Sequence, residues 1–361
     1  MYKRQAPDNA EARAMLTAAA LSSNDQALIK KSQSLIAEAI AKNPTDEQLQ
    51  LAQARMLAAL GDHKTAISNL ETYCQSKEGS TSVPAILTLG EFYRAGGDIT
   101  KSGQKLDQAA KLAPDSPAVV RARARWLGTQ KKFSEVLKVV ADYRAKGRED
   151  PETLAVAAAV LVSSKSKGDQ REAVKLYEEV VKAMPASTDA RLGLASATYA
   201  VGDADRAKQM YREVLKQNPA SVRALNDLAW ILAEHDRDYK AALELADNGL
   251  RLAPNDRYLL DTRGVILSNL PDRLKDARSD FEKLVSVSLA DSSAQAKALL
   301  QLGRVCAKLK DQEAATRHLE KALQIDRQKS VFDPKERSEL QDLIRRSKVE
   351  SVAASSDSAA R

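Results

Sequence analysis

A repeat of about 34 residues is the feature that most constrains how this chain of 361 residues can fold. Nine units can be aligned, and successive starts lie between 34 residues (13 to 47) and 39 residues (257 to 296) apart. A fixed period of this length is typical of a stack of small structural units, each of which packs on its neighbours. The units start at Arg13, Glu47, Val83, Pro117, Leu154, Thr188, Val222, Arg257 and Ala296.

Residue size repeats within each unit. Position 8 is small in all units but one, and the exception is Leu161. Position 20 is small except at Val136, and a large residue follows four positions later except at Ala246. Two antiparallel helices approach closely only where one of them has little side-chain bulk, and a large neighbour then fills the adjoining groove. The pattern therefore predicts two tightly packed helices in every unit.

Turn signals separate the predicted helices. Glycine can end a helix in the left-handed region, and aspartate can cap the next helix. Proline cannot continue a helix. The sequence has Gly-Asp pairs at 61–62, 97–98, 168–169 and 202–203, and prolines at Pro44, Pro114, Pro185, Pro219 and Pro254. We expect a short turn at each pair and a helix end before each of these prolines.

The register of small, large and proline residues resembles the tetratricopeptide repeat, a helix-turn-helix family. The resemblance implies an all-α fold, a right-handed superhelical α-solenoid of about nine units over residues 10–326. Asp333, Pro334 and Glu336 form a capping-box pattern, which predicts a C-terminal capping helix over 327–348. We expect a frayed N-terminus over 1–9 and a disordered Ser/Ala/Asp-rich tail over 349–361.

No pattern in the sequence predicts catalysis, a metal site or a cofactor. The histidines His63, His235 and His318 lie in separate units of a rigid stack, where they cannot converge on one metal or one nucleophile. Cys74 and Cys306 lie at helix positions that face neighbours, which favours packing over reactivity. The segment 96–102 lacks the glycine before lysine that a phosphate-binding loop needs.

The resemblance implies that the first helix of each unit lines a concave groove and that positions 2, 5, 9 and 12 point into it. A basic group, Arg94, Arg121 and Arg125, favours an acidic peptide as partner, because guanidinium groups bind carboxylates well. Tyrosine and tryptophan are common anchors of binding sites. The predicted partner-binding residues are Arg55, Arg94, Arg121, Arg125, Tyr199, Asn226, Trp230, Tyr258, Asp261 and Arg304, and the wider set of groove positions also contains Glu91, Ser196 and Lys297.

These observations predict a non-catalytic scaffold that binds a segment of another protein. The main alternative is an accessory region of a larger enzyme or envelope-assembly system, with the preceding part missing. RNA binding is less favoured, because no position carries a run of polar reading residues and the net charge of +7 is spread along the chain. We therefore expect no nucleic-acid partner.

The sequence contains no recognisable membrane-spanning or secretory signal. No apolar run reaches the roughly 20 residues that a membrane-spanning helix needs, and no secretory signal is recognised at the N-terminus. The default expectation is a cytoplasmic protein, with a periplasmic or envelope-associated location as the alternative if the natural chain begins earlier.

Overall fold

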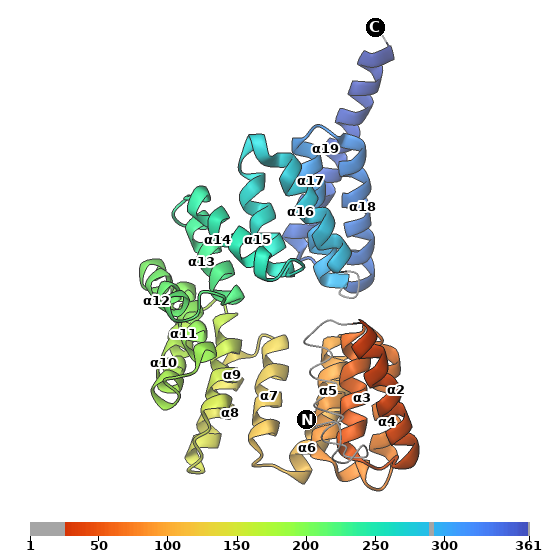
Figure 1. Ribbon diagram of the computed structural model, residues 1–361, viewed down its shortest axis with the longest axis vertical. Coiled ribbons are helices and arrows are strands. Elements are labelled where there is room, and N and C mark those ends of the chain that lie inside the picture. Colours follow the sequence, from red (N-terminus) through yellow and green to blue (C-terminus); the bar gives the residue numbers. More distant parts are fainter. Residues whose placement is uncertain (1–25, 289–291, 360–361) are drawn as a thin grey trace. The chain divides into compact units, whose positions relative to one another are not determined.

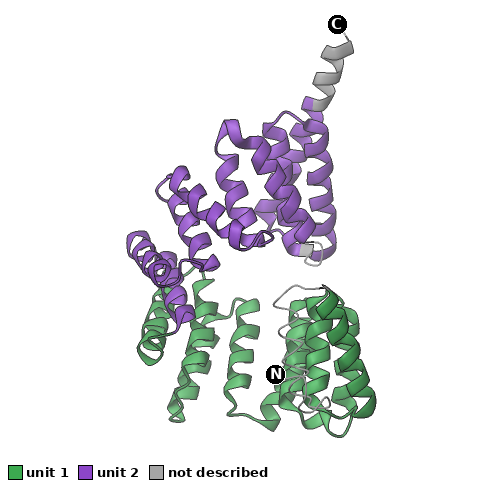
Figure 2. Ribbon diagram, viewed as in Figure 1, with its two compact units in different colours: residues 1–186 green, residues 187–361 purple. Residues whose placement is uncertain are grey.

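The computed structural model describes residues 26–288 and 292–359, in which the regular structure is entirely helical (Figure 1). Within these ranges 18 α-helices and two short 3-10 helices, Gly79–Thr81 and Pro271–Arg273, follow one another along the chain. The helices belong to two compact units, residues 1–186 (unit 1) and 187–361 (unit 2) (Figure 2). The protein is therefore all-α, as the repeat predicts.

Both units are built from consecutive helices that pack in adjacent pairs, α3 with α4 through to α17 with α18. Unit 1 contains α2 (Gln26–Lys42), α3 (Glu47–Ala59), α4 (His63–Gln75), α5 (Val83–Ala95), α6 (Ile99–Leu112), α7 (Pro117–Thr129), α8 (Phe133–Ala145), α9 (Pro151–Val162) and α10 (Lys167–Ala183). Unit 2 contains α11 (Thr188–Val201), α12 (Ala204–Gln217), α13 (Val222–Glu234), α14 (Tyr239–Leu252), α15 (Arg257–Ser268), α16 (Leu274–Val287), α17 (Ser292–Lys308), α18 (Gln312–Lys329) and α19 (Pro334–Ala359).

The first helix of a pair begins where the sequence register places it in six cases, α3, α5, α7, α11, α13 and α15. Two first helices start earlier, α9 at Pro151 and α17 at Ser292. Asp150 caps α9 by accepting a hydrogen bond from the backbone N–H of Thr153, which explains its earlier start. The helix expected from Arg13 lies outside the described residues.

The predicted small and large positions meet in the interior of the hairpins. A Cβ atom placed on Gly264 would lie 2.8 Å from the ring of Phe281, and one on Gly303 would lie 2.6 Å from the side chain of Leu319. These distances are too short for a real carbon contact, so glycine is required for the helices to approach this closely. The size pattern in the sequence therefore describes true contacts between the two helices.

The two large residues at small positions are accommodated by alanine on the other helix of the same pair. Val136 and Leu161 are both fully buried. The unit with Val136 has Ala124 at position 8, and the unit with Leu161 has Ala173 at position 20. Both alanines are buried as well, so the summed side-chain volume of each pair stays small.

Turn chemistry sets most helix ends. Gly61, Gly97 and Gly202 have positive φ angles of 85°, 85° and 107°, and the aspartate after each of them caps the following helix. The α-helices before the five prolines, α2, α6, α10, α12 and α14, each end two residues before the proline. The turn expected at Gly168-Asp169 was wrong. Both residues lie inside α10, because Ser166 caps that helix three residues before Asp169.

Helix α19 covers the apolar end of the last hairpin. Its predicted capping box is present: the backbone N–H of Asp333 donates to the Glu336 carboxylate, and the backbone N–H of Glu336 donates to Asp333 (both 2.9 Å). Leu340 and Ile344 are buried against α17 and α18. The sequence predicted a helix end at 348 and disorder beyond it, and the helix instead continues to Ala359.

Replacing Ala195 by tryptophan is expected to destabilise unit 2 by about 1–3 kcal/mol, because overfilling a packed interior strains the neighbouring side chains. Ala195 is fully buried in the core of unit 2. Thermal unfolding followed by circular dichroism measures the effect. Arg212→Trp, on the exposed surface of α12, is the control. Equal melting temperatures for the two variants would contradict the helix-packing register.

Candidate functional site

Each of the ten predicted binding residues lies on the first helix of a hairpin, as the register requires. Unit 1 carries four of them and unit 2 carries six. Those of unit 1 are Arg55, Arg94, Arg121 and Arg125, and those of unit 2 are Tyr199, Asn226, Trp230, Tyr258, Asp261 and Arg304.

Arg121 on α7 is held by carboxylates of the chain itself. Its Nη1 atom lies 2.7 Å from an Asp150 oxygen and 3.4 Å from an oxygen of Glu152. Asp150 also caps α9 through Thr153. Arg121 therefore connects α7 to the start of α9, and the structure gives it a role in joining two hairpins.

Arg94 and Arg125 share one acidic partner, Glu91 on α5. Nε of Arg94 lies 2.7 Å from the Glu91 carboxylate, and Nη1 of Arg125 lies 3.6 Å from it. The spacing of Glu91 and Arg94 on one helix is the signal that could have indicated the first pair. The basic group that the sequence suggested is thus a set of ion pairs. Arg55 on α3 is exposed to solvent.

Arg304 on α17 is also paired. Its Nη2 atom lies 3.7 Å from Glu339 on the capping helix α19, and its Nη1 atom donates to Gln301. Since Glu339 belongs to the helix that covers the last hairpin, Arg304 contributes to docking of α19.

The first helices α13 and α15 lie side by side, and a direct hydrogen bond joins them. The Thr262 hydroxyl on α15 donates to the amide oxygen of Asn226 on α13, at 2.8 Å. Trp230 is one turn after Asn226, and Tyr258 is one turn before Thr262, so both aromatic residues lie on the face that this bond defines. Asn226 is therefore a structural link in the middle of the predicted aromatic patch.

Tyr199 on α11 has Trp230 on α13 as a neighbour. Burial and the charge of Glu234 raise the pKa of Tyr199, while a hydrogen bond with Trp230 lowers it. Both side chains are half-buried. We call the set Tyr199, Asn226, Trp230, Tyr258, Asp261 and Lys297 the first-helix face of unit 2.

A cleft of about 260 Å³ opens at one end of this face, between α15, α16 and α17. The sequence-predicted groove positions Tyr258, Asp261 and Lys297 all line it. Tyr258 is 61% exposed. The apolar wall comes from Leu284 and Ala298, both buried. The structure thus brings three predicted residues from two hairpins together in one concavity, which we call the α15–α17 cleft.

Two polar groups in the α15–α17 cleft have no hydrogen-bond partner within the part of the chain that the structure describes. One is the Asp261 carboxylate, and Lys297 is the charged group that acts on its pKa. Burial raises the pKa of Asp261, and Lys297 lowers it. The other is the Ser288 hydroxyl, on a residue only 2% exposed. Buried polar groups are normally hydrogen-bonded, so the Ser288 hydroxyl is an exception, and it belongs to the same cleft as the half-buried Asp261 carboxylate.

Sequence reasoning did not identify Ser288. It lies at the end of the second helix of its hairpin, where the resemblance predicts no groove residue. A serine at a helix end is too common to be a signal by itself, and only its burial beside Asp261 distinguishes it.

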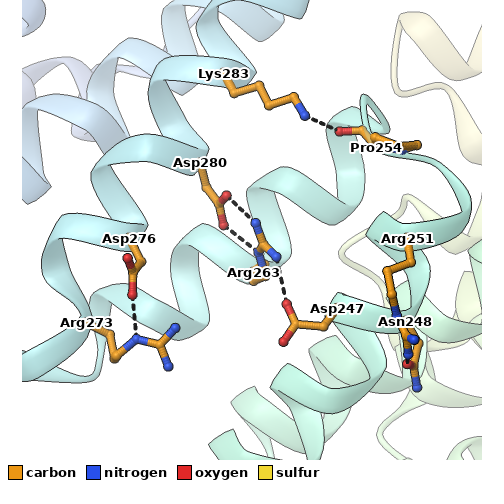
Figure 3. Close-up of polar contacts among 9 residues, drawn as sticks. All are labelled: Asp247, Asn248, Arg251, Pro254, Arg263, Arg273, Asp276, Asp280 and Lys283. Atoms are coloured by element: carbon orange, nitrogen blue, oxygen red, sulfur yellow. Dashed lines mark hydrogen bonds and ion pairs between the residues drawn. The ribbon is translucent and has the colours of Figure 1, made fainter.

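A second polar group of unit 2 is fully satisfied by its own members (Figure 3). Arg263 on α15 donates through Nε and Nη2 to both oxygens of Asp280 on α16 (2.7 and 2.6 Å) and through Nη1 to Asp247 on α14 (2.7 Å). These contacts raise the pKa of Arg263 further above its ordinary value. A guanidinium group with three such contacts fastens three helices, and its role is structural.

Reactive groups are dispersed among the described residues. In residues 26–288 and 292–359, no three His, Cys, Asp or Glu side chains come together as ligands for a metal ion. Burial raises the pKa values of Cys74 and Cys306, which makes their thiols poor nucleophiles. Burial lowers the pKa of His318.

Across the same described segments, no helix combines the length and the apolar composition that crossing a lipid bilayer requires.

Family models for the tetratricopeptide repeat match two segments, residues 194–257 and residues 296–329. The second match begins at the unit start Ala296. No curated protein matches the chain. Among solved structures, the crystal structure of MamA matches with a TM-score of 0.39 and 19% sequence identity, over 46% of this chain and 94% of that chain.

The matched segments cover α12, α13, α14 and α18 completely and most of α17. The helix pairs of both units have the same alternation of small and large buried residues as these segments. The chain therefore contains tetratricopeptide repeats.

Proposed function

We propose that this protein is a non-catalytic scaffold that binds a segment of another protein on the first-helix face of unit 2. Tetratricopeptide repeats bind other proteins in general. The observation that carries the proposal is the α15–α17 cleft, where the exposed Tyr258 lies beside Asp261 and Ser288, whose side-chain oxygens have no hydrogen-bond partner among the described residues.

The size of the cleft favours a peptide side chain over a small molecule. Small-molecule sites are usually clefts of roughly 300–1,000 Å³ that enclose most of the ligand. The α15–α17 cleft is about 260 Å³ and opens onto Tyr258 at the surface. A protein segment can place one side chain in the cleft and continue along Trp230 and Tyr199.

Unit 1 is the weaker candidate for this binding. An acidic peptide, the partner that the arginines first suggested, would have to replace Glu91, Asp150 and Glu152 around them. Each ion pair that the peptide replaces is lost from the free chain, so the net free energy of binding an acidic partner is small.

The test is a selection of peptides from a display library on the intact chain. Tyr258→Ala is expected to weaken the selected peptides by about 2 kcal/mol, since exposed aromatic residues often act as binding hot spots. Leu252→Ala is the matched control, because Leu252 is 52% exposed and ends the second helix α14. Selected peptides that bind both variants as tightly as the unaltered chain would overturn the proposal. Tight binding of single-stranded RNA, with an affinity that falls steeply as the salt concentration rises, would favour RNA as the partner instead of a protein segment.

A further inference from the structure

The groove residues of this protein differ in whether their charge is already satisfied. Arg94, Arg121, Arg125 and Arg304 each have a carboxylate of the chain within 4 Å. Asp261 is the opposite case: its carboxylate is half-buried and receives no hydrogen bond from the described residues. Asp261 is therefore the carboxylate of the α15–α17 cleft to which a cationic group of a ligand could donate.

Resting on the proposed function, we infer that the α15–α17 cleft binds an arginine side chain of the partner segment, with Asp261 as its carboxylate. This reverses the charge of the partner that the arginines of the groove suggest from sequence.

The carboxylate of Asp261 favours arginine over lysine. Its two oxygens are acceptors without a partner within the described ranges, and they belong to a residue that lines the cleft. A guanidinium group has five N–H donors in a planar fork and can donate to two acceptors at once. An ammonium group is a compact point charge and lacks this planar match.

Tyr258 adds a surface suited to the same group. The chain's own Arg257 places its guanidinium carbon 4.9 Å from the centre of the Tyr258 ring and donates to the phenol oxygen at 3.0 Å. The ring therefore already attracts a guanidinium group, as aromatic faces do. Its 61% exposure leaves ring surface for contact with the stem of an incoming arginine.

An anionic ligand fits the cleft poorly. Lys297 is the cation whose charge acts on the Asp261 carboxylate. Its side chain is exposed, so water already solvates its ammonium group. Arg257 is engaged with Tyr258. An incoming carboxylate would be repelled by Asp261 and would leave its carboxylate unsatisfied, whereas a guanidinium group satisfies it.

The test uses the peptides selected on the intact chain, each synthesised with arginine and with its neutral isostere citrulline. The expected result is that the selected peptides contain an arginine and that citrulline weakens binding about tenfold or more, the usual effect of losing a charge-assisted hydrogen bond. Asp261→Asn is expected to weaken the arginine peptide by a similar factor and to leave the citrulline peptide unchanged. Glu244→Gln, an equal change of charge on the exposed surface of α14, is the control and is expected to have no effect.

The outcomes separate the two proposals. Peptides that depend on Tyr258 but bind equally with citrulline, or bind Asp261→Asn unchanged, overturn the arginine inference and leave the proposed function standing. Enrichment of acidic peptides that depend on Tyr258 also overturns it. Peptides that are indifferent to Tyr258 overturn the proposed function itself. Circular dichroism of each variant shows that the fold is retained, and Asp261→Glu, which keeps the charge, is expected to keep the preference for arginine over citrulline.

Discussion

Replacing Phe281 by alanine is expected to lower the free energy of unfolding of unit 2 by about 3–5 kcal/mol, the usual cost of removing a buried phenylalanine side chain. Phe281 is 1% exposed and its ring lies against the backbone of Gly264. Urea denaturation followed by helical circular dichroism measures the loss. Val287→Ala, on a side chain of the same helix that is 38% exposed, is the control and is expected to cost about 0.5 kcal/mol.

The same contact predicts a change of sign in a double mutant. Gly264→Ala alone should destabilise unit 2, because the new Cβ would meet the Phe281 ring at 2.8 Å and displace it. With Phe281→Ala already present, Gly264→Ala should stabilise unit 2 by about 0.5–1 kcal/mol, since alanine favours the helix more than glycine does. A destabilising effect in both backgrounds would contradict the glycine–phenylalanine contact.

Replacing Asp326 by alanine is expected to weaken the docking of α19 by about 3 kcal/mol. Asp326 is 1% exposed and accepts hydrogen bonds from the Arg337 guanidinium and from the backbone N–H of Phe332. The estimate is at the lower end for a buried pair, because solvent screens Arg337, whose side chain is 37% exposed. Hydrogen exchange of the α19 amides measures the loss.

The control for this variant is Asp342→Ala, which removes a surface pair with Arg345 one turn away on α19. Exposed pairs contribute about 1 kcal/mol at most. Equal hydrogen-exchange rates in α19 for the two variants would contradict a special role of Asp326.

The Asp326 pair also makes the docking of α19 sensitive to acid. The hydrogen bond from Arg337 is the main cause that lowers the pKa of Asp326 below its ordinary value. A carboxylate with a lowered pKa in the folded state stabilises fully above its unfolded pKa, about 3.9 for aspartate, and loses this contribution as the pH falls through the folded value. Below about pH 4, the protection of the α19 amides, relative to their intrinsic exchange rate at the same pH, should therefore fall in the unaltered chain, and Asp326→Asn should remove that pH dependence.

The sequence register anticipated the hairpins because residue size is a local property with a strict packing consequence. Where two helices touch, at least one of them presents glycine, alanine or serine, and Gly264 opposite Phe281 is an example. The Gly168-Asp169 turn was wrong for an equally local reason. Ser166 offered an earlier cap, and glycine is tolerated in the first turn of a helix.

The candidate site was predicted less completely. The family register placed Tyr258 and Asp261 together on one helix, since that depends only on helical periodicity, and both lie on α15. It could not show that Arg121 is neutralised by Asp150, because that carboxylate comes from the next hairpin. Nor could it show that Ser288 closes the wall of the cleft at the end of α16.

The amino-acid order by itself therefore determined the helices, their pairing and the side of each hairpin on which a partner is expected, because those depend on size and periodicity within about 34 residues. Only the tertiary structure decided which charges remain open to a ligand. Charge neutralisation depends on distances between side chains of different hairpins. A difference of a few ångströms separates an arginine already bound to a carboxylate from an aspartate that receives no hydrogen bond from the residues the structure describes.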